Sequence, residues 1–414
     1  MKDVTSMAPL AQSRRFFWAT GLECSYPVIT GKNGRQIRID ELEKTRHYQN
    51  WELDFQLTRE MGLRYLRYGP PYYKVHLGAG KYDWEFVDLT FHKMKELEII
   101  PIADLCHFGV PDFIGGFGNP DFAKLFAEFA EAFARRYPWV RYYTPVNEID
   151  TTAQFSGLLG WWNDQEKSDR GYVTVLKNCV KAAILAEEAI SKVQPDAFFI
   201  QSEGTSYYHA LHPEAVDRAN FLNARRFLPS DLSYGILVDS TMYQYLLDNG
   251  LSRDEYHWFM RQGQRLRPRC IMGNDYYAMN EHITPPGDEP ITHSDRMFGY
   301  YMLIQQYFNR YHMPMMYTET NQRNYESAEA WLREQFSCVL RLKYEGFPLI
   351  GFTWYSLVDQ VDWNTSLRED NGHVDPLGLY DLDRKIRPVG KLYKELVAQW
   401  HDILTLEMPG NAKG

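Results

Sequence analysis

Short apolar segments alternate with longer amphipathic segments along most of the chain. Most of the short segments are near-continuous hydrophobic runs, which is typical of parallel strands covered on both faces. We interpret eight of them as strands, at residues 16–23, 63–69, 99–108, 142–148, 197–204, 271–277, 314–320 and 349–357.

Amphipathic segments between these runs predict helices. The clearest is residues 119–137, where phenylalanines recur at helical spacing. Asn119 is the expected N-cap of this helix, with Pro120 at its first position. Residues 327–346 predict a second helix, which Gly346 is placed to end.

The regular alternation of strands and helices predicts a closed (β/α)₈ barrel, also called a TIM barrel. No linker rich in Gly, Ser or Pro divides the chain. We therefore expect one catalytic barrel domain over residues 1–414, with short flexible tails at both ends. Residues 228–269 are longer than one helix requires, so we expect them to decorate the barrel rim.

Composition excludes several classes of partner. The net charge is −9 and no basic block concentrates positive charge, which argues against nucleic acid and anionic membranes as partners. The five cysteines are widely spaced and lack metal-site patterns, so neither a disulfide framework nor a zinc site is expected. Residues 1–18 lack the apolar core of a signal peptide, and no segment is apolar enough to span a bilayer. These features favour a cytoplasmic location.

In such a barrel, functional residues lie at the C-terminal ends of the strands. The predicted strand ends carry carboxylates, hydrogen-bonding groups and aromatic rings: Glu23, Arg67, His107, Asn147, Glu148, Glu203, Tyr277, Glu319 and Trp354. There is no glycine loop for phosphate, and a single His does not indicate a metal site, so we expect no cofactor and no metal.

A site rich in Glu and Trp indicates carbohydrate, because aromatic faces stack on sugar rings and carboxylates bind hydroxyls. Two carboxylates can also break a glycosidic bond. From their strand-end positions alone, four residues are candidates for that pair: Glu23, Glu148, Glu203 and Glu319.

Several segments, in order from about Phe16 to about Leu396, resemble glycoside hydrolase family 1, the β-glucosidase family of the clan A barrel hydrolases. "PVNEI" resembles its acid/base motif T-x-N-E-P, and "MYTETNQ" resembles its nucleophile motif I/V-T-E-N-G. The remaining similar segments are "LRYLRYG", "CHFGVPDF", "NDYY", "WYSLVDQVDW" and "GLYDLDRKIRPVGKLYKEL".

The resemblance implies a retaining mechanism through a covalent glycosyl-enzyme, with Glu148 as general acid/base and Glu319 as nucleophile. It implies that Arg67 and Tyr277 support Glu319, and that Asn147 binds the sugar 2-hydroxyl. The substrate-binding residues expected from it are Glu23, Arg67, His107, Asn147, Tyr277, Trp354, Asp362 and Trp363. Glu203 matches no family motif and is expected to be structural.

Departures from the family motifs indicate a divergent relative with altered sugar recognition. Asp275 replaces the Asn of N-Y-Y, and Asp362 replaces a sugar-binding Glu. Trp354 stands one place before the family's Trp, whose slot holds Tyr355. The region after the last strand lacks the Lys-x-Tyr of relatives that bind 6-phosphorylated glycosides; Arg368 is its single cation.

The leading hypothesis is a retaining β-glycosidase, β-glucosidase-like, that acts on small, non-phosphorylated carbohydrates. A negative Asp362 near the sugar 6-hydroxyl would repel a phosphate. One alternative is a transglycosylase with the same carboxylate pair. Another, from a different class, is a sugar-binding barrel without catalytic activity. The sequence leaves the sugar, the linkage, the aglycone and the oligomeric state open.

Overall fold

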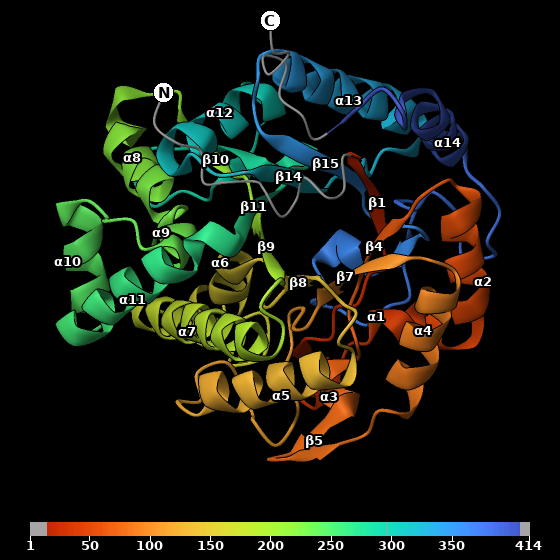
Figure 1. Ribbon diagram of the computed structural model, residues 1–414. Helices are drawn as coiled ribbons and strands as arrows, with labels where there is room; N and C mark the ends of the chain where they lie inside the picture. The colour runs from red at the N-terminus through yellow and green to blue at the C-terminus, as the bar shows by residue number, and fades with distance from the viewer. Residues whose placement is uncertain (1–14, 295, 406–414) are drawn as a thin grey trace, which may run out of the picture.

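Eight parallel strands pair in sequence order until the last meets the first, which closes a barrel surrounded by helices (Figure 1). The computed structural model describes residues 15–294 and 296–405. The barrel strands are β1 (Phe17–Gly21), β4 (Tyr65–Tyr68), β7 (Ile100–Asp104), β8 (Tyr142–Thr144), β9 (Phe198–Gly204), β11 (Cys270–Asp275), β14 (Met315–Glu319) and β15 (Leu349–Trp354). The predicted TIM barrel and its eight strands are confirmed; the expected tails lie outside the described residues.

Helices form the outer layer and the connections above the barrel. They are α1 (Glu41–Lys44), α2 (His47–Glu60), α3 (Tyr72–Val75), α4 (Glu85–Glu96), α5 (Phe122–Arg136), α6 (Ile149–Ala153), α7 (Asp169–Val193), α8 (Val216–Arg225), α9 (Leu228–Tyr234), α10 (Ser240–Asp248), α11 (Arg253–Leu266), α12 (Gly299–Tyr311), α13 (Ala328–Tyr344) and α14 (Pro388–Trp400). Shorter helical turns are the π-helix η2 (Gln154–Leu158) and the 3₁₀ turns η3 (Pro213–Ala215), η4 (Arg267–Arg269), η5 (Ala278–Asn280), η6 (Tyr325–Ser327) and η7 (Trp363–Thr365).

Short strands outside the barrel pair among themselves in the loops. They are β2 (Val28–Thr30), β3 (Gln36–Arg38), β5 (His76–Gly78), β6 (Lys81–Tyr82), β10 (Tyr207–Ala210), β12 (Glu281–Thr284), β13 (Thr292–His293), β16 (Gln360–Val361) and β17 (Val374–Asp375). The pair β16–β17 follows the last barrel strand and carries residues next to the predicted site.

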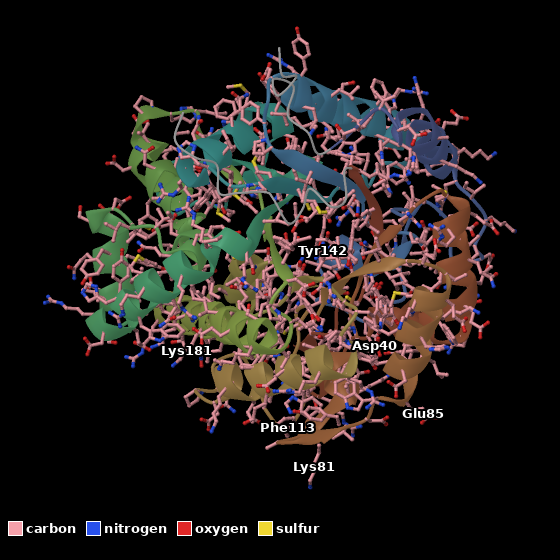
Figure 2. All side chains as sticks on the ribbon, viewed as in Figure 1. Asp40, Lys81, Glu85, Phe113, Tyr142 and Lys181 are labelled. Atoms are coloured by element: carbon pink, nitrogen blue, oxygen red, sulfur yellow. The ribbon has the colours of Figure 1, made fainter. Side chains whose placement is uncertain are left out.

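Two apolar cores hold the barrel. The larger lies between the strands and the helices, and the smaller fills the barrel itself with side chains from its strands. In the smaller core, the ring of Phe17 stacks on that of Tyr65 with centroids 4.0 Å apart. Tyr142, which packs against this core, lies near the middle of Figure 2, whereas Lys81 and Glu85 lie at the molecular edge. Because side chains fill the interior of the barrel, the polar groups at the strand ends lie directly above a close-packed apolar core.

The predicted C-terminal end of α13 agrees with the structure, whereas the predicted N-terminal end of α5 does not. α13 ends at Tyr344, and Gly346 follows with φ +85°, as expected of a residue beyond a helix C-terminus. α5 begins at Phe122, later than predicted, because Asn119 instead closes a separate turn. Its Oδ1 accepts a hydrogen bond from the Asp121 N–H at 2.9 Å.

The long segment predicted to decorate the rim forms α9, α10 and α11. α9 and α11 pack against each other and against α7, so the segment thickens the outer helical layer on one side (Figure 1). Within the described part of the chain, no helix is both long and apolar enough to cross a membrane.

Candidate active site

A pocket of about 140 Å³ lies where the barrel strands end. Its lining includes these predicted site residues: Glu23, His107, Glu148, Tyr277, Glu319 and Trp363. Arg67 and Asn147 do not line it but lie buried beneath it, hydrogen-bonded to lining residues. Trp354 and Asp362 are not part of the lining.

Glu319, the last residue of β14, has one partner for each carboxylate oxygen. Nη1 of Arg67 forms an ion pair with Oε1, and the Tyr277 hydroxyl donates a 2.6 Å hydrogen bond to Oε2. A cation and a hydrogen-bond donor both favour the ionised form of a carboxyl group. Glu319 is almost fully buried, and both of its oxygens are held by such partners.

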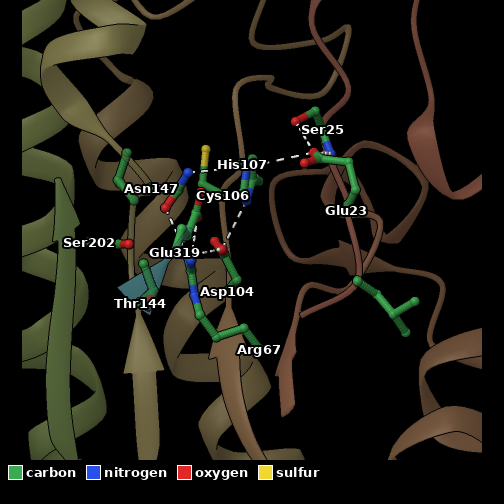
Figure 3. Close-up of polar contacts among 12 residues, drawn as sticks. Glu23, Ser25, Arg67, Asp104, Cys106, His107, Thr144, Asn147, Ser202 and Glu319 are labelled. Carbon is green, nitrogen blue, oxygen red and sulfur yellow. Dashed lines mark hydrogen bonds and ion pairs between the residues drawn. The ribbon is translucent and has the colours of Figure 1, made fainter. Parts of the chain in front are cut away.

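Arg67 also orients the residues around the nearest strand ends (Figure 3). Its Nη2 donates to Asp104 at 2.9 Å and to Asn147 Oδ1 at 2.8 Å. Because the amide oxygen of Asn147 faces Arg67, its amide nitrogen faces His107 Nε2 at 3.1 Å and donates to it. The His107 hydrogen then lies on Nδ1, which donates to Asp104 at 2.9 Å. One arginine thus fixes both an amide and an imidazole.

Glu148 follows β8 in a left-handed backbone conformation with φ +38°. Two contacts hold this turn: the Glu148 N–H donates to Ser202 O, and Glu203 accepts the N–H groups of Ile149 and Asp150. Burial, followed by the charges of Asp275 and Glu319, raises the pKa of Glu148 well above its ordinary value. A raised pKa suits a group that donates a proton, whereas the contacts of Glu203 described here are with the backbone of this turn.

Glu23 and Trp363 face the pocket with unused hydrogen-bonding capacity. Ser25 binds Glu23 Oε1 through its N–H at 3.0 Å and through its hydroxyl, and no partner in the described chain reaches Oε2. Burial raises the pKa of Glu23, and the two bonds from Ser25 oppose the shift. Trp363 Nε1 is buried without an acceptor among residues 15–294 and 296–405. Glu23 Oε2 is therefore free to bind a polar ligand, whereas the ring of Trp363 offers the pocket an aromatic surface.

Trp354 does not occupy the place expected for a sugar-binding residue. Its ring is fully buried in the core between strands and helices, and its Nε1 donates to Leu377 O at 3.0 Å. Adjacent residues of an extended chain face opposite sides, so Tyr355 turns to the pocket side. Its ring centroid lies 5.4 Å from Arg67 Cζ. The prediction that Trp354 contacts the sugar is corrected by this geometry.

Asp362 is likewise occupied by the protein. Its carboxylate accepts bonds from Lys44 Nζ and from the His373 N–H, both at 2.8 Å, and the side chain is fully buried. Burial alone would raise the pKa of Asp362, but Lys44 and the backbone N–H groups lower it. The predicted sugar contact is therefore corrected, and Lys44 offsets the charge that was expected to repel a phosphate.

The sequence interpretation missed several lining residues, among them Asn321, Gln322, Arg323 and Gln360. Arg323 is exposed at the pocket, where its Nη2 donates to Trp363 O at 2.8 Å. It lies four residues beyond Glu319, outside the strand end on which the interpretation relied. Arg368 does not line the pocket; its Cζ lies 4.3 Å from the centroid of the Trp161 ring.

One group of side chains has the composition of a metal site. Cys24, Asp104 and His107 offer ligand atoms within 4.8 Å of one another. Asp104 Oδ2, however, already accepts bonds from Arg67 and from His107 Nδ1. Both ring nitrogens of His107 also have partners, Asp104 at Nδ1 and Asn147 at Nε2. A metal ion bound by His107 would have to break one of these bonds, so the group does not fit a metal in this arrangement.

Comparisons with known proteins find similarity to glycosidases. The family model described as Glycosyl hydrolase family 1 matches residues 29–225. An aryl-phospho-β-D-glucosidase from Bacillus subtilis (strain 168) is 22% identical over 444 residues, covering 90% of each chain. A 6-phospho-β-glucosidase from Escherichia coli (strain K12) is 21% identical, covering 88% of this chain and 87% of the relative. A β-glucosidase from Thermotoga maritima, solved with deoxynojirimycin, superposes with a TM-score of 0.78 at 16% identity, covering 92% and 97% of the two chains.

Proposed function

Because the chain is a distant member of glycoside hydrolase family 1, we propose that it hydrolyses terminal, non-phosphorylated β-glycosides with retention of configuration, as a β-glucosidase-like enzyme. The observation that carries this proposal is the contrast between two carboxyl groups in one pocket. Glu319 has the partners of a carboxylate, and the pKa of Glu148 is raised by burial and neighbouring charge. Such a pair supplies one nucleophile and one acid.

In the first step, a Glu319 oxygen attacks the anomeric carbon while Glu148 protonates the glycosidic oxygen, and the bond between that carbon and that oxygen breaks. The product is a glycosyl ester on Glu319 and a free alcohol. In the second step, Glu148, now a carboxylate, takes a proton from water as the water oxygen attacks the anomeric carbon. Glu319 leaves as a carboxylate, to which Arg67 and Tyr277 again contribute their bonds.

Sugar hydroxyls would meet groups that the protein leaves available. Glu23 Oε2 has no partner in the described chain, and Trp363, whose buried Nε1 also lacks one, presents its ring to the pocket. An acceptor without a partner and an aromatic surface in one pocket suit a ligand with several hydroxyl groups on an apolar ring. This combination supports a neutral sugar as the substrate.

A second candidate substrate class is the phosphorylated β-glycosides, on which two curated relatives act according to their names. Arg323 is the observation in its favour, because it places a cation at the pocket. We favour the neutral class, since the carboxylate of the proposed nucleophile Glu319 in the same pocket would repel a phosphate. A transglycosylase would use the same two carboxyl groups, and an inactive sugar-binding barrel would use the same pocket without turnover.

The proposal is tested by turnover of a panel of nitrophenyl glycosides, followed by trapping with a 2-fluoro glycoside. We expect turnover of a β-glycoside and labelling of the peptide that contains Glu319. Glu319→Gln should lose several orders of magnitude in rate and resist labelling while remaining folded. Failure to turn over any member of the panel would favour the inactive sugar-binding barrel. Labelling of another carboxylate would identify that residue as the nucleophile in place of Glu319.

A further inference from the structure

Asp275 is a carboxyl group at the centre of the site that the proposed reaction does not use. It is the last residue of β11 and is fully buried. Its Cα pairs with that of Glu319 on β14 and with that of Gly204 on β9. A Cβ on Gly204 would lie 3.1 Å from Glu148 Oε1, so the Glu148 carboxyl lies over the residue that pairs with Asp275. The motif that this segment resembles has Asn at this position.

The place of Asp275 among other carboxyl groups favours a proton on it. Ser202 Oγ donates to the carboxyl group, at 2.8 Å from one oxygen and 2.7 Å from the other. This bond by itself favours the charged form of Asp275. Full burial and the carboxyl group of Glu319 on the paired strand act in the opposite direction, because a charge is costly in both surroundings.

No cation neutralises Asp275. Among the described residues it forms no ion pair, because the nearest guanidinium, that of Arg67, binds Glu319, Asp104 and Asn147 instead. The charged and titratable groups that face it are Arg67 on β4, Glu148 after β8, Tyr277 after β11, Tyr300 on α12 and Glu319 on β14. Burial, and then the charge of Glu319, raise the pKa of Asp275 to about 8, against the opposing effect of Arg67.

We propose that Asp275 is a positioning residue that carries a proton at neutral pH and whose negative charge, once formed in alkaline solution, keeps the proton on Glu148. At neutral pH the uncharged form leaves Glu319 as the carboxylate that Arg67 and Tyr277 hold. In alkaline solution Asp275 gives its proton to hydroxide, forming water, and the new charge opposes a second ionisation nearby. An Asn in this place would supply similar hydrogen bonds without the charge.

The inference rests on the proposed glycosidase reaction, and the first test uses the pH dependence of kcat/KM for an aryl β-glycoside. After burial, the charge of Asp275 contributes most to the raised pKa of Glu148. We expect Asp275→Asn to move the alkaline limb about one pH unit lower, a tenfold difference in proton concentration. The matched control is Glu187→Gln. Glu187 is also buried with a pKa raised to about 8, but it lies beside Cys270 at the opposite end of β11.

An alkaline limb that stays in place in Asp275→Asn, or that moves equally in Glu187→Gln, would overturn the proposal. A second measurement does not need turnover. Infrared spectra at pH 7 should contain a protonated-carboxyl C=O band that is absent from Asp275→Asn, and the absence of such a difference would also overturn it.

If Asp275→Asn does not fold, Ser202→Ala serves in the infrared test. Its Asp275 band should shift to higher frequency, because the carboxyl C=O loses its hydrogen-bond donor; an unshifted spectrum would contradict the proposal. Failure of the proposed function would give a different result from failure of the proposal about Asp275. If the proposed function is wrong, the native protein turns over no glycoside, but its infrared spectrum still reports whether Asp275 is protonated.

Discussion

The hydroxyl group of Tyr277, which follows β11, donates a 2.6 Å hydrogen bond to Oε2 of Glu319 at the end of β14. The other oxygen of Glu319 is paired with Arg67, so each oxygen has its own partner. The two partners come from neighbouring and distant strands of the barrel, and together they fix the direction of the carboxylate. A nucleophile held in this way needs little rearrangement before it attacks.

Loss of that bond gives a first prediction. Tyr277→Phe keeps the ring but removes the donor, and a hydrogen bond to a charged group contributes about 1.5–3 kcal/mol. We expect kcat/KM to fall by about 10- to 100-fold. Steady-state kinetics on a nitrophenyl β-glycoside would measure this. The matched control is Tyr325→Phe, an exposed tyrosine in η6 outside the pocket lining. Equal effects of the two changes would argue against a role for Tyr277 at Glu319.

The acid/base role of Glu148 predicts a dependence on the leaving group. Glu148→Ala should slow substrates with poor leaving groups far more than activated aryl glycosides, because a good leaving group departs without protonation. Azide should restore part of the rate, since a small anion attacks the glycosyl-enzyme without a general base. The measurement is kcat/KM across a leaving-group series with and without azide. Uniform loss without rescue would contradict this assignment.

Substrate charge gives a third prediction. We expect a higher kcat/KM for nitrophenyl β-glucoside than for its 6-phosphorylated counterpart, because the carboxylate of the nucleophile Glu319 in the same pocket would repel a phosphate. Arg323→Gln should change this ratio little if the neutral class is right. A strong preference for the phosphorylated substrate that disappears in Arg323→Gln would instead support the second candidate class and identify Arg323 as its anion-binding residue.

The pH dependence of stability follows from Glu187, a buried residue of α7. Burial raises the pKa of Glu187 in the folded state from 4.5 to about 8. Between these values the folded state holds a proton that the unfolded state has lost, so the free energy of unfolding falls as pH rises through this window. The slope for one such group is about 1.4 kcal/mol per pH unit.

Glu187→Gln should remove this contribution, so that its stability advantage over the native protein grows from about pH 4.5 to about pH 8 and then stays constant. Urea unfolding at about pH 5 and about pH 7.5, within this window, would measure the difference. An identical pH dependence in the two proteins would show that Glu187 is ionised in the folded state at neutral pH.

The local pattern of the sequence determined the barrel and placed four candidate carboxyl groups at one face, from which the family resemblance selected Glu148 and Glu319. Buried parallel strands need apolar side chains on both faces, so each strand appears as an apolar run that is visible without knowledge of its partners. Because all eight strands end at one face, Glu148 and Glu319 were assigned to a common site although they are far apart in sequence. The register of a strand and the pairing of individual charges do not follow from such runs.

Tertiary structure decided which neighbouring residues reach the pocket. The pairing of β14 with β15 contains a register shift after Met315, and the chain beyond it turns Tyr355 toward Arg67 while Trp354 packs outward. A change of one residue reverses the face of a side chain in a strand, and the motif comparison had already placed Trp354 one residue early. Lys44 binds the carboxylate of Asp362, which is therefore not available to a sugar. Ser202 donates a hydrogen bond to Asp275. Both contacts join residues that are distant in the chain. Such contacts arise only when the barrel closes and brings these side chains within hydrogen-bonding distance.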